Sequence, residues 1–439
     1  MSKRPQVALA PVISLTIADG EDIGYMSIRF EWKSFVNGGY VIKASLEDPE
    51  YSQLGRIVKD YYLDRGRKSP TKVVFELKWP GAESTLQHIA YITHLSSHGI
   101  HNNGVLEFIA VDPPSYWLNA GDSAGKVYTG CVSDVIKKVV KEYYVDPDNA
   151  YSGKEAKIEV TETSDSKSNQ WWMMRQDPKT FINSLLDWSS SLTKKKTNWM
   201  VSADGNTKGE PSLWIKEQAD RTSVNYGLYY HNTEAPSAED TVGTFEFLGD
   251  NFMSVFNKSL ITHGISATSG AFYDRKMDKD RKIVHVYDEN TSEKKNVRIS
   301  DEQGFAKPKD NSSIEKPYEW STSIKSVPQF SAGDLGIKYR SYIDGRARQS
   351  FLNMLNLVMR IKLEVAGDPS PNLANSHNLG VSRIKIAWKD QLHGDSYFLD
   401  GDWMVYGFVH IVDRSMSVGW KTDIYCYRLD YDAESKKIS

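Results

Sequence analysis

The strongest constraint on the fold is a two-residue alternation of apolar and polar side chains that recurs along the chain. In residues 72–79, apolar side chains occupy every second position, from Val73 to Trp79. Successive side chains of a β-strand point to opposite faces, so this spacing predicts a strand with one buried face. The same alternation recurs in residues 357–365 and 384–388, near the other end of the chain. The sequence therefore predicts an α+β protein that is mainly β, with strands at both ends.

Residues 1–115 are predicted to form a first β domain. Its expected strands are short segments bounded by Asp, Gly and Asn: residues 12–17, 26–32, 40–46, 72–79, 88–95 and 105–111. Asn103-Gly104 predicts the turn of a hairpin between the last two strands. Asp112-Pro113-Pro114 then predicts the end of the last strand, because proline cannot donate a hydrogen bond to a β-ladder. We place a domain boundary close to residue 115.

Residues 116–240 are predicted to form a small α/β domain. Apolar residues at helical spacing, from Val135 to Tyr143, predict a helix that begins near Ser133. Asp177 followed by Pro178 predicts the start of a second helix, because Asp caps helices well and proline suits the first helical position. Two short strands are expected at residues 198–202 and 212–216.

From residue 241 the chain is predicted to be β again. A second, split β domain is expected over residues 241–300 and 345–432, with strands at residues 252–263, 281–287, 357–365, 384–388, 403–412 and 420–429 and a helix that begins at Asp344 or Gly345. In residues 275–316, 20 of 42 side chains are charged, with mixed signs. This composition indicates a solvated surface connection, assigned to residues 301–344, or an arm that orders when a partner binds. Residues 433–439 are a tail.

The sequence contains no convincing catalytic, cofactor or metal site. His94, His98 and His101 could hold zinc only on a helix, whereas their segment is predicted to be a strand that enters a hairpin. The loop from Gly121 to Lys126 has three residues between its glycines where a phosphate-binding loop has four, and no Ser or Thr follows the lysine.

Two further features could suggest chemistry. Cys131 precedes a predicted helix, whose dipole could activate a thiol, but no histidine partner is identifiable. Asp400 and Asp402 beside Trp403 could act as sugar-cleaving carboxylates, although such pairs arise by chance among 57 acidic residues. The net charge of −3 argues against a chain built mainly to grip nucleic acid.

Three segments together resemble a known family. Residues 171–186 contain Gln176, a few polar residues, Phe181-Ile182 and then Leu185. This segment is similar to a helix start in hub proteins of contractile phage tails and in type VI secretion spike proteins. The helix predicted in residues 130–143 is of the kind that precedes that motif in the same families.

The third segment lies near the C-terminus. Trp403, Val405 and His410 are followed by Gly419-Trp420 and a threonine two residues later. This order resembles the final hairpin of the hub, where a Trp-x-Val strand with a later histidine precedes Gly-Trp-x-Thr. The sequence of a β domain, a small α/β domain and a second β domain also fits the hub portion of these proteins.

The resemblance implies a structural protein without catalytic residues, cofactor or metal. It implies two tail-tube-like antiparallel β-barrel domains with a small α/β domain between them. Three chains would form a pseudo-six-fold ring that joins the six-fold tail tube to the three-fold central spike. No spike-like domain follows Asp430, so the spike is expected to be a separate chain.

The implied partners are the other two chains of a homotrimer, the tail tube or its initiator, the central spike, and the tape-measure and baseplate wedge proteins. DNA would pass transiently through the channel, and no membrane insertion is expected. The implied location is the virion baseplate, assembled in the host cytoplasm. Two alternatives remain open from the residues alone: a polysaccharide-degrading tail enzyme, with aromatic side chains as sugar platforms, and a receptor-binding or adhesin module.

Overall fold

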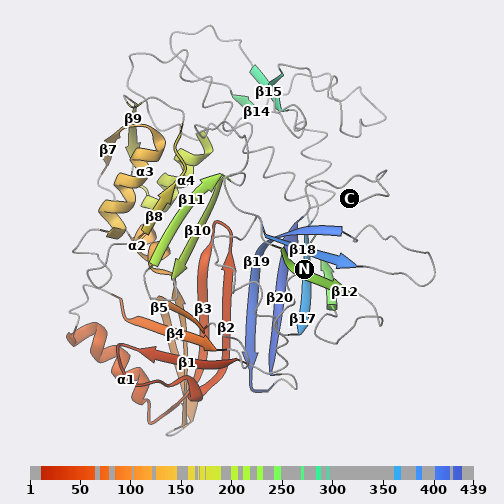
Figure 1. The fold of residues 1–439 in the computed structure, drawn as a ribbon. Helices are drawn as coiled ribbons and strands as arrows, with labels where there is room; N and C mark the ends of the chain where they lie inside the picture. Colours follow the sequence, from red (N-terminus) through yellow and green to blue (C-terminus); the bar gives the residue numbers. More distant parts are fainter. Residues whose placement is uncertain are drawn as a thin grey trace.

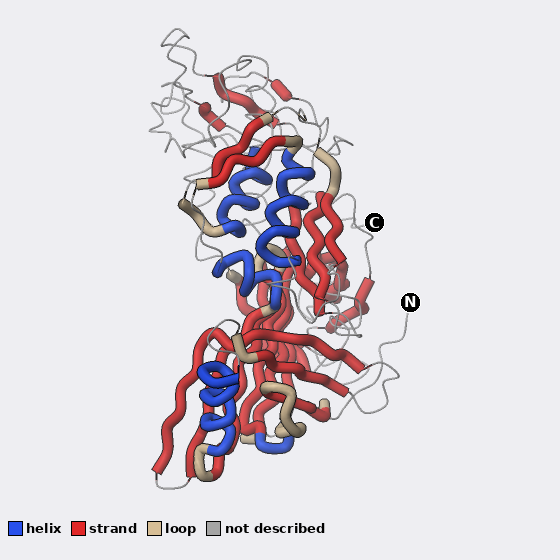
Figure 2. Tube along the Cα trace, turned by 90° about the vertical axis from the view of Figure 1, so that its left-hand side faces the viewer, coloured by secondary structure: helices blue, strands red, loops and turns tan. Residues whose placement is uncertain are grey.

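The computed structural model shows a mainly β protein with a small group of helices (Figures 1 and 2). It describes residues 11–64, 70–78, 85–100, 103–120, 125–145, 157–163, 167, 169–173, 175–188, 199–205, 211–217, 225–230, 242–248, 268–270, 283–287, 294–295, 360–366, 382–387, 401–415 and 419–427. Among these residues, no helix is both long enough and apolar enough to cross a membrane.

The N-terminal β portion contains six antiparallel strands, which pair in the order β1-β4-β5-β6-β3-β2. They are β1 (Val12–Ile17), β2 (Ser27–Phe35), β3 (Gly39–Pro49), β4 (Lys72–Lys78), β5 (Thr85–Ile100) and β6 (Asn103–Val111). β1 and β4 cross over β2 and β3 (Figure 1). This crossing encloses an apolar core in which the rings of Phe30 and Trp32 pack on Phe75, with centroids 5.7 and 5.6 Å apart.

One short α-helix of this portion was missed in the sequence. α1 (Ser52–Lys59) runs directly into a π-helical turn at Asp60–Asp64. The buried Asp48 carboxylate accepts hydrogen bonds from the backbone N–H groups of Gln53 and Leu54 at 2.8 and 3.0 Å. The capping side chain therefore belongs to Asp48, four residues before the helix, and the left-handed Tyr51 (φ 56°) lies between them. A cap is expected in the sequence immediately before a helix, so this one was not recognised.

The hairpin of β5 and β6 is confirmed, but its predicted turn was placed wrongly. Asn103 and Gly104 lie inside β6 and pair with Pro49 and Asp48 of β3. A Cβ atom on Gly104 would lie 2.8 Å from the Asp48 carbonyl oxygen. Glycine is therefore used for close strand packing here, and Asn103-Gly104 does not form the turn.

The predicted α/β portion follows the first sheet. It contains α2 (Pro113–Ala120), β7 (Lys126–Thr129), α3 (Val132–Val140), a π-helical turn (Lys141–Val145), β8 (Lys157–Val160), β9 (Gln170–Met173), α4 (Pro178–Trp188), β10 (Trp199–Gly205) and β11 (Pro211–Glu217). The strand pairs are β7 with β9, and β10 with β11, which also pairs with the parallel β8. The predicted N-cap of α4 is confirmed, since Asp177 accepts a hydrogen bond from the Thr180 N–H at 2.8 Å.

The C-terminal strands extend the first sheet. They are β12 (Asn225–Tyr230), β13 (Val242–Phe247), β17 (Arg360–Ala366), β18 (Ser382–Ala387), β19 (Gly401–Asp413) and β20 (Trp420–Tyr427). The antiparallel pair β2–β19 connects them to the N-terminal strands in one 12-stranded sheet. One apolar core on this sheet contains residues from both β portions.

The remaining described strands are short. They are β14 (Thr268–Gly270), β15 (Ile283–Tyr287) and β16 (Lys294–Lys295), and β15 matches the strand predicted at residues 281–287. The strand predicted at residues 252–263, the helix predicted from Asp344 or Gly345, and the connection at residues 301–344 lie outside the described residues.

Candidate assembly interface

One face of the large sheet carries mostly charged and polar side chains. The strand registers and the alternation of side chains put these residues on the same face, here called the polar face. Its polar members are His94, Ser96 and His98 (β5), Glu107 (β6), Lys43, Ser45 and Glu47 (β3), Arg29, Glu31 and Lys33 (β2), Asp413 (β19), Lys421 and Asp423 (β20), Lys362 and Glu364 (β17) and Glu246 (β13). The polar face therefore crosses eight neighbouring strands of the sheet.

Ion pairs connect the strands of this face. The Arg29 guanidinium lies 3.5 Å from the Asp413 carboxylate, and so joins β2 to β19. The Lys362 ammonium lies 3.3 Å from Asp423 and 3.8 Å from Glu246, across three strands. Ion pairs at a surface each contribute about 0–1 kcal/mol, so they favour one register more than they stabilise the fold.

Several of these carboxyl groups are well covered. Burial alone would raise the pKa of Glu31, but the ammonium groups of Lys33 and Lys43 outweigh it and hold the pKa below its usual value. The Ser415 hydroxyl and backbone N–H lower the pKa of Asp413, with Arg29 adding to the effect. These carboxylates stay ionised at neutral pH, so the face is charged on both sides of the β2–β19 pair.

The polar face is hollowed over β2, β3, β5 and β6. The hollow has a volume of about 330 Å³, and Arg29, Glu31, Lys43, His94 and Glu107 are among the residues that line it. Side chains of both signs share this hollow, and among the described residues no group of His, Cys, Asp or Glu has the arrangement of a metal site. The hollow is therefore a solvated concavity in a wide sheet face.

The β2–β19 pair is the junction between the two β portions. Its register runs from Phe35 opposite Gly407 to Arg29 opposite Asp413. On the apolar side, Trp32 contacts both portions, with ring centroids 5.6 Å from Phe75 and 5.3 Å from Phe408. The junction therefore has an apolar core on one side and ion pairs on the other.

Two histidines lie in this core, one from each β portion. His88 and His410 are fully buried, and burial lowers the pKa of each to about 3. The His410 Nδ1 atom lies 2.8 Å from the Thr422 hydroxyl oxygen. Both imidazoles are neutral at physiological pH and enclosed by aromatic rings, so they act in packing and not in proton transfer.

The two β portions repeat one strand arrangement in the same chain order. β2, β3, β4, β5 and β6 correspond to β13, β17, β18, β19 and β20, because the neighbours of each strand match. Even the irregularities match: the register shifts after Ile92 in β5 and after Val405 in β19. In each case the shift separates the segment that pairs with β4 or β18 from the segment beyond it. β1 and β12 differ, since β1 pairs antiparallel with β4 and β12 pairs parallel with β18.

The corresponding strands also carry corresponding side chains on the polar face. Aligned by register, Glu31 matches Glu246, Lys43 matches Lys362, and Glu107 matches Asp423. Each repeat thus presents an acid, a lysine and an acid on three successive strands. We call the strand sets β5-β6-β3-β2 and β19-β20-β17-β13 the first and second units.

The two units differ at their outer edges. One edge of β19 pairs first with β18 and then, over residues 407–413, with β2 of the first unit. The corresponding edge of β5 pairs first with β4, but residues 93–100 of that edge pair with no described strand. At the other end of the second unit, β13 likewise has one edge that pairs with no described strand. The eight-stranded face therefore ends in two edges that match the two sides of its own internal junction.

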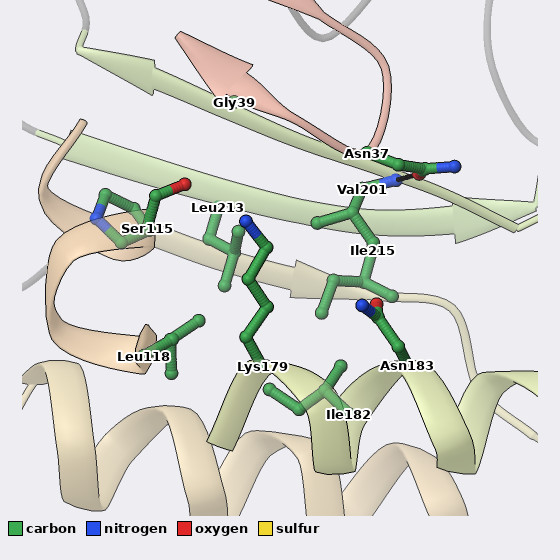
Figure 3. Close-up of a pocket in the computed structure, with 11 residues that line it drawn as sticks. Asn37, Gly39, Ser115, Leu118, Lys179, Ile182, Asn183, Val201, Leu213 and Ile215 are labelled. Atoms are coloured by element: carbon green, nitrogen blue, oxygen red, sulfur yellow. Dashed lines mark hydrogen bonds between the residues drawn. The ribbon is translucent and has the colours of Figure 1, made fainter. Parts of the chain in front are cut away.

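A second hollow lies where the α/β portion meets the β2–β3 turn (Figure 3). The Asn37 N–H donates to the Val201 carbonyl, and the Val201 N–H donates to the Asn37 side-chain oxygen, both at 2.8 Å. Lys179 and Asn183 of α4 point toward this space (Figure 3). Its volume of about 30 Å³ holds roughly one water molecule, so it is a packing crevice between two portions of the chain.

The residues considered as sites from the sequence are not brought together. His94 and His98 lie exposed on β5, whereas His101 is outside the described residues. Cys131 is buried, with its sulfur 3.3 Å from the Ser133 hydroxyl. Trp403 is fully buried and cannot serve as a sugar platform beside Asp402, and Asp400 lies outside the described residues. Most of the Gly121–Lys126 loop is also outside them.

The fold is similar to that of solved phage tail proteins. The 43 kDa tail protein of prophage MuSo2 from Shewanella oneidensis superposes with a TM-score of 0.52 at 10% identity, over 96% of this chain and 98% of that one. The chain has the fold of a phage tail protein. A tail protein from Neisseria meningitidis gives a TM-score of 0.51 at 9% identity, with 95% and 97% of the two chains covered.

A chain of a VgrG-containing complex shares this fold. A chain of the PdpA–VgrG complex of Francisella matches with a TM-score of 0.51 at 10% identity, over 100% of this chain and 61% of that one. This chain therefore corresponds to somewhat less than two thirds of that protein. No protein-family model and no curated protein sequence matches.

Proposed function

We propose that the chain is the baseplate hub of a contractile phage tail, and that it acts as a homotrimer. In this proposal three chains form a pseudo-six-fold ring that joins the six-fold tail tube to the three-fold central spike. The phage-tail fold supports it, and the observation that carries it is the repeat. Each chain presents two equivalent units, so three chains present six.

The internal junction supports a specific contact between chains in the proposed ring. β2 and β19 already join two units edge to edge within one chain. If the same junction forms between chains, β13 of one chain pairs with residues 93–100 of β5 in the next. Transfer of the register places Glu246 opposite His98, as Glu31 lies opposite Ile411. A cyclic trimer would use every such edge and leave none open to aggregation.

The polar face then lines the channel of the ring. Its mixed charges and its hollow suit a wet surface along which DNA or protein passes without being held. In the proposed hub, residues 1–115 and the split segment 241–300 with 345–432 form the two tube-like barrel domains, and residues 301–344 form a surface connection. Residues 116–240 contain the α/β domain, but their last strand, β12, pairs with β18 and so joins the second barrel.

The remaining features of the proposal follow from this role. In this role the chain is a structural protein and not an enzyme. It is part of the virion tail and contacts the tail tube or its initiator and the central spike, with the tape-measure and wedge proteins as further partners.

Light scattering coupled to size-exclusion chromatography tests the proposal. At micromolar concentration in low salt, the purified chain is expected to have the mass of three copies. A uniform particle with the mass of one copy at this concentration contradicts the ring.

A further inference from the structure

An aromatic cluster lies on the polar face at the junction of the two units. Phe35 of β2 contacts Tyr425 of β20 with ring centroids 5.0 Å apart, and Tyr406 of β19 at 6.2 Å. Tyr406 also contacts Tyr425 and Tyr427, at 6.1 and 6.0 Å. Phe35, Tyr406 and Tyr425 are half-buried, so part of each ring faces outward.

The sequence makes room for this cluster. A Cβ atom on Gly407 would lie 2.1 Å from the Phe35 ring, so glycine lets that ring lie against the β19 backbone. Tyr406 occupies the register shift of β19, which turns its side chain toward the other rings. Two local irregularities therefore combine to build one aromatic surface.

A cation with an unused donor borders the cluster. Arg360 lies opposite Tyr427 in the β17–β20 register, and its guanidinium bonds the Tyr406 hydroxyl. Among the described residues the buried Arg360 Nε atom has no hydrogen-bond partner, whereas the residue as a whole is only partly buried. An unsatisfied buried donor costs about 1–3 kcal/mol, and a carboxylate is the acceptor that satisfies a guanidinium best.

The first unit lacks this cluster at the corresponding positions. By register, Arg360, Tyr406, Tyr425 and Tyr427 match Val41, Thr93, Ile109 and Val111. The two units share the charged pattern of the polar face but differ here. In a trimer of these chains the cluster would occur three times and not six.

We infer that this cluster is a docking site for a polypeptide segment that presents aromatic or aliphatic side chains and one carboxylate. The inference deepens the proposed hub function, in which the segment belongs to another tail protein present in three copies inside the ring. Phe35, Tyr406 and Tyr425 take the apolar side chains, and Arg360 takes the carboxylate. One chain supplies all of these residues, so each chain binds one segment.

The charges around the cluster favour a peptide over a nucleic acid. Burial raises the pKa of Tyr425, and the negative charges of Asp423, Glu246 and Glu31 add to the effect. A polyanion with a phosphate at every nucleotide would meet these carboxylates, whereas a peptide with a single carboxylate needs only Arg360.

Fluorescence anisotropy with the full chain tests the inference. The probe is a fluorescein-labelled, amidated hexapeptide that contains two phenylalanines and one glutamate. Binding of one peptide per chain is expected, and the same peptide with glutamine in place of glutamate is expected to bind about tenfold more weakly, because the charge-assisted hydrogen bond is lost.

The matched variant replaces the cluster with the residues of the first unit: Arg360→Val, Tyr406→Thr and Tyr425→Ile. These are strand-forming residues, so light scattering should show the same oligomer as the original chain while peptide binding falls at least tenfold. Absence of peptide binding to the original chain, equal binding to the variant, or preferred binding of a thymidine oligonucleotide overturns the inference.

The two proposals fail separately. The docking site lies within one chain, so a monomeric chain that binds the peptide contradicts the ring alone. A trimer that does not bind the peptide contradicts the docking site alone.

Discussion

The first and second units reach the same strand order with very different connections. In the first, β2 and β3 are joined by a tight turn at residues 36–38, whereas β13 and β17 are separated by residues 248–359. Both pairs nevertheless bring an acid opposite a lysine, Glu31 with Lys43 and Glu246 with Lys362. The entropy of loop closure grows slowly with length, so side-chain alternation and cross-strand pairs fix the register whatever the length of the connection.

The largest effect should come from breaking the core shared by the units. Trp32→Ala removes a ring that packs on Phe75 of the first portion and Phe408 of the second, and should lower the free energy of unfolding by about 3–5 kcal/mol. Urea denaturation measures it. Trp172→Ala, at a residue that is 41% exposed, is the control and should cost much less. Equal losses for both variants would mean that the two portions do not share a core.

Acid should weaken both units through their buried histidines. The pKa of His88 and of His410 is about 3 in the folded chain and near 6.5 when unfolded, so the unfolded state binds more protons below pH 6.5. The contribution of these histidines to the free energy of unfolding is fully present above pH 6.5. It falls toward pH 3 by about 1.4 kcal/mol per pH unit for each histidine.

Urea midpoints between pH 6.5 and 5 check this slope, in a range above the titration of ordinary carboxylates. His410→Leu should remove about half of the histidine contribution and leave that of His88. An unchanged pH slope in this variant would show that His410 is not buried as a neutral group.

A smaller effect is expected from the ion pair across the junction. Asp413→Asn removes the charge that faces Arg29 at 3.5 Å and should cost about 0.5–1 kcal/mol. The loss should shrink in 1 M salt, because ions screen surface pairs. Lys216→Met, which removes an ion pair with Glu159 in the α/β portion, is the comparison away from the junction. A loss that does not depend on salt would point to packing instead of charge.

The smallest effect should appear in the assembly and not in the fold. His98 is exposed and, in the proposed ring, lies opposite Glu246 of the next chain. His98→Glu should weaken the trimer and His98→Lys should strengthen it, each by about 0.2–1 kcal/mol per contact. Light scattering over a dilution series measures both. If the two variants dissociate at the same concentration, this edge is not the interface.

Much of the fold could be predicted from the sequence because alternation is a local signal. The alternation that includes Val73 and Phe75 predicts β4, and the cap at Asp177 predicts the start of α4. β19 and α3 also lie at the predicted segments. α1 was missed because its cap, Asp48, belongs to a strand. α2 was missed because Pro113 and Pro114 indicate the end of a strand, whereas here they also begin a helix.

The polar face could not be predicted, because it depends on strand order. The repeat leaves only short traces in the sequence: Phe-Glu-Trp at residues 30–32 against Phe-Glu-Phe at 245–247, and Ile-Lys at 42–43 against 361–362. Such fragments arise by chance, and only the registers show that they occupy equivalent places. The edges of β5 and β13 that pair with no described strand are likewise a property of the strand order and not of any single segment.

Disulfide trapping tests most directly whether the internal junction is repeated between chains. Glu246→Cys with His98→Cys should give covalent dimers and trimers on a non-reducing denaturing gel after mild oxidation. Glu31→Cys with Ile411→Cys, the equivalent pair inside one chain, should crosslink without any increase in mass. The native Cys131 and Cys426 are buried and should not interfere. If the internal pair crosslinks while the Glu246 and His98 pair stays at the mass of one chain, the ring as described here is wrong.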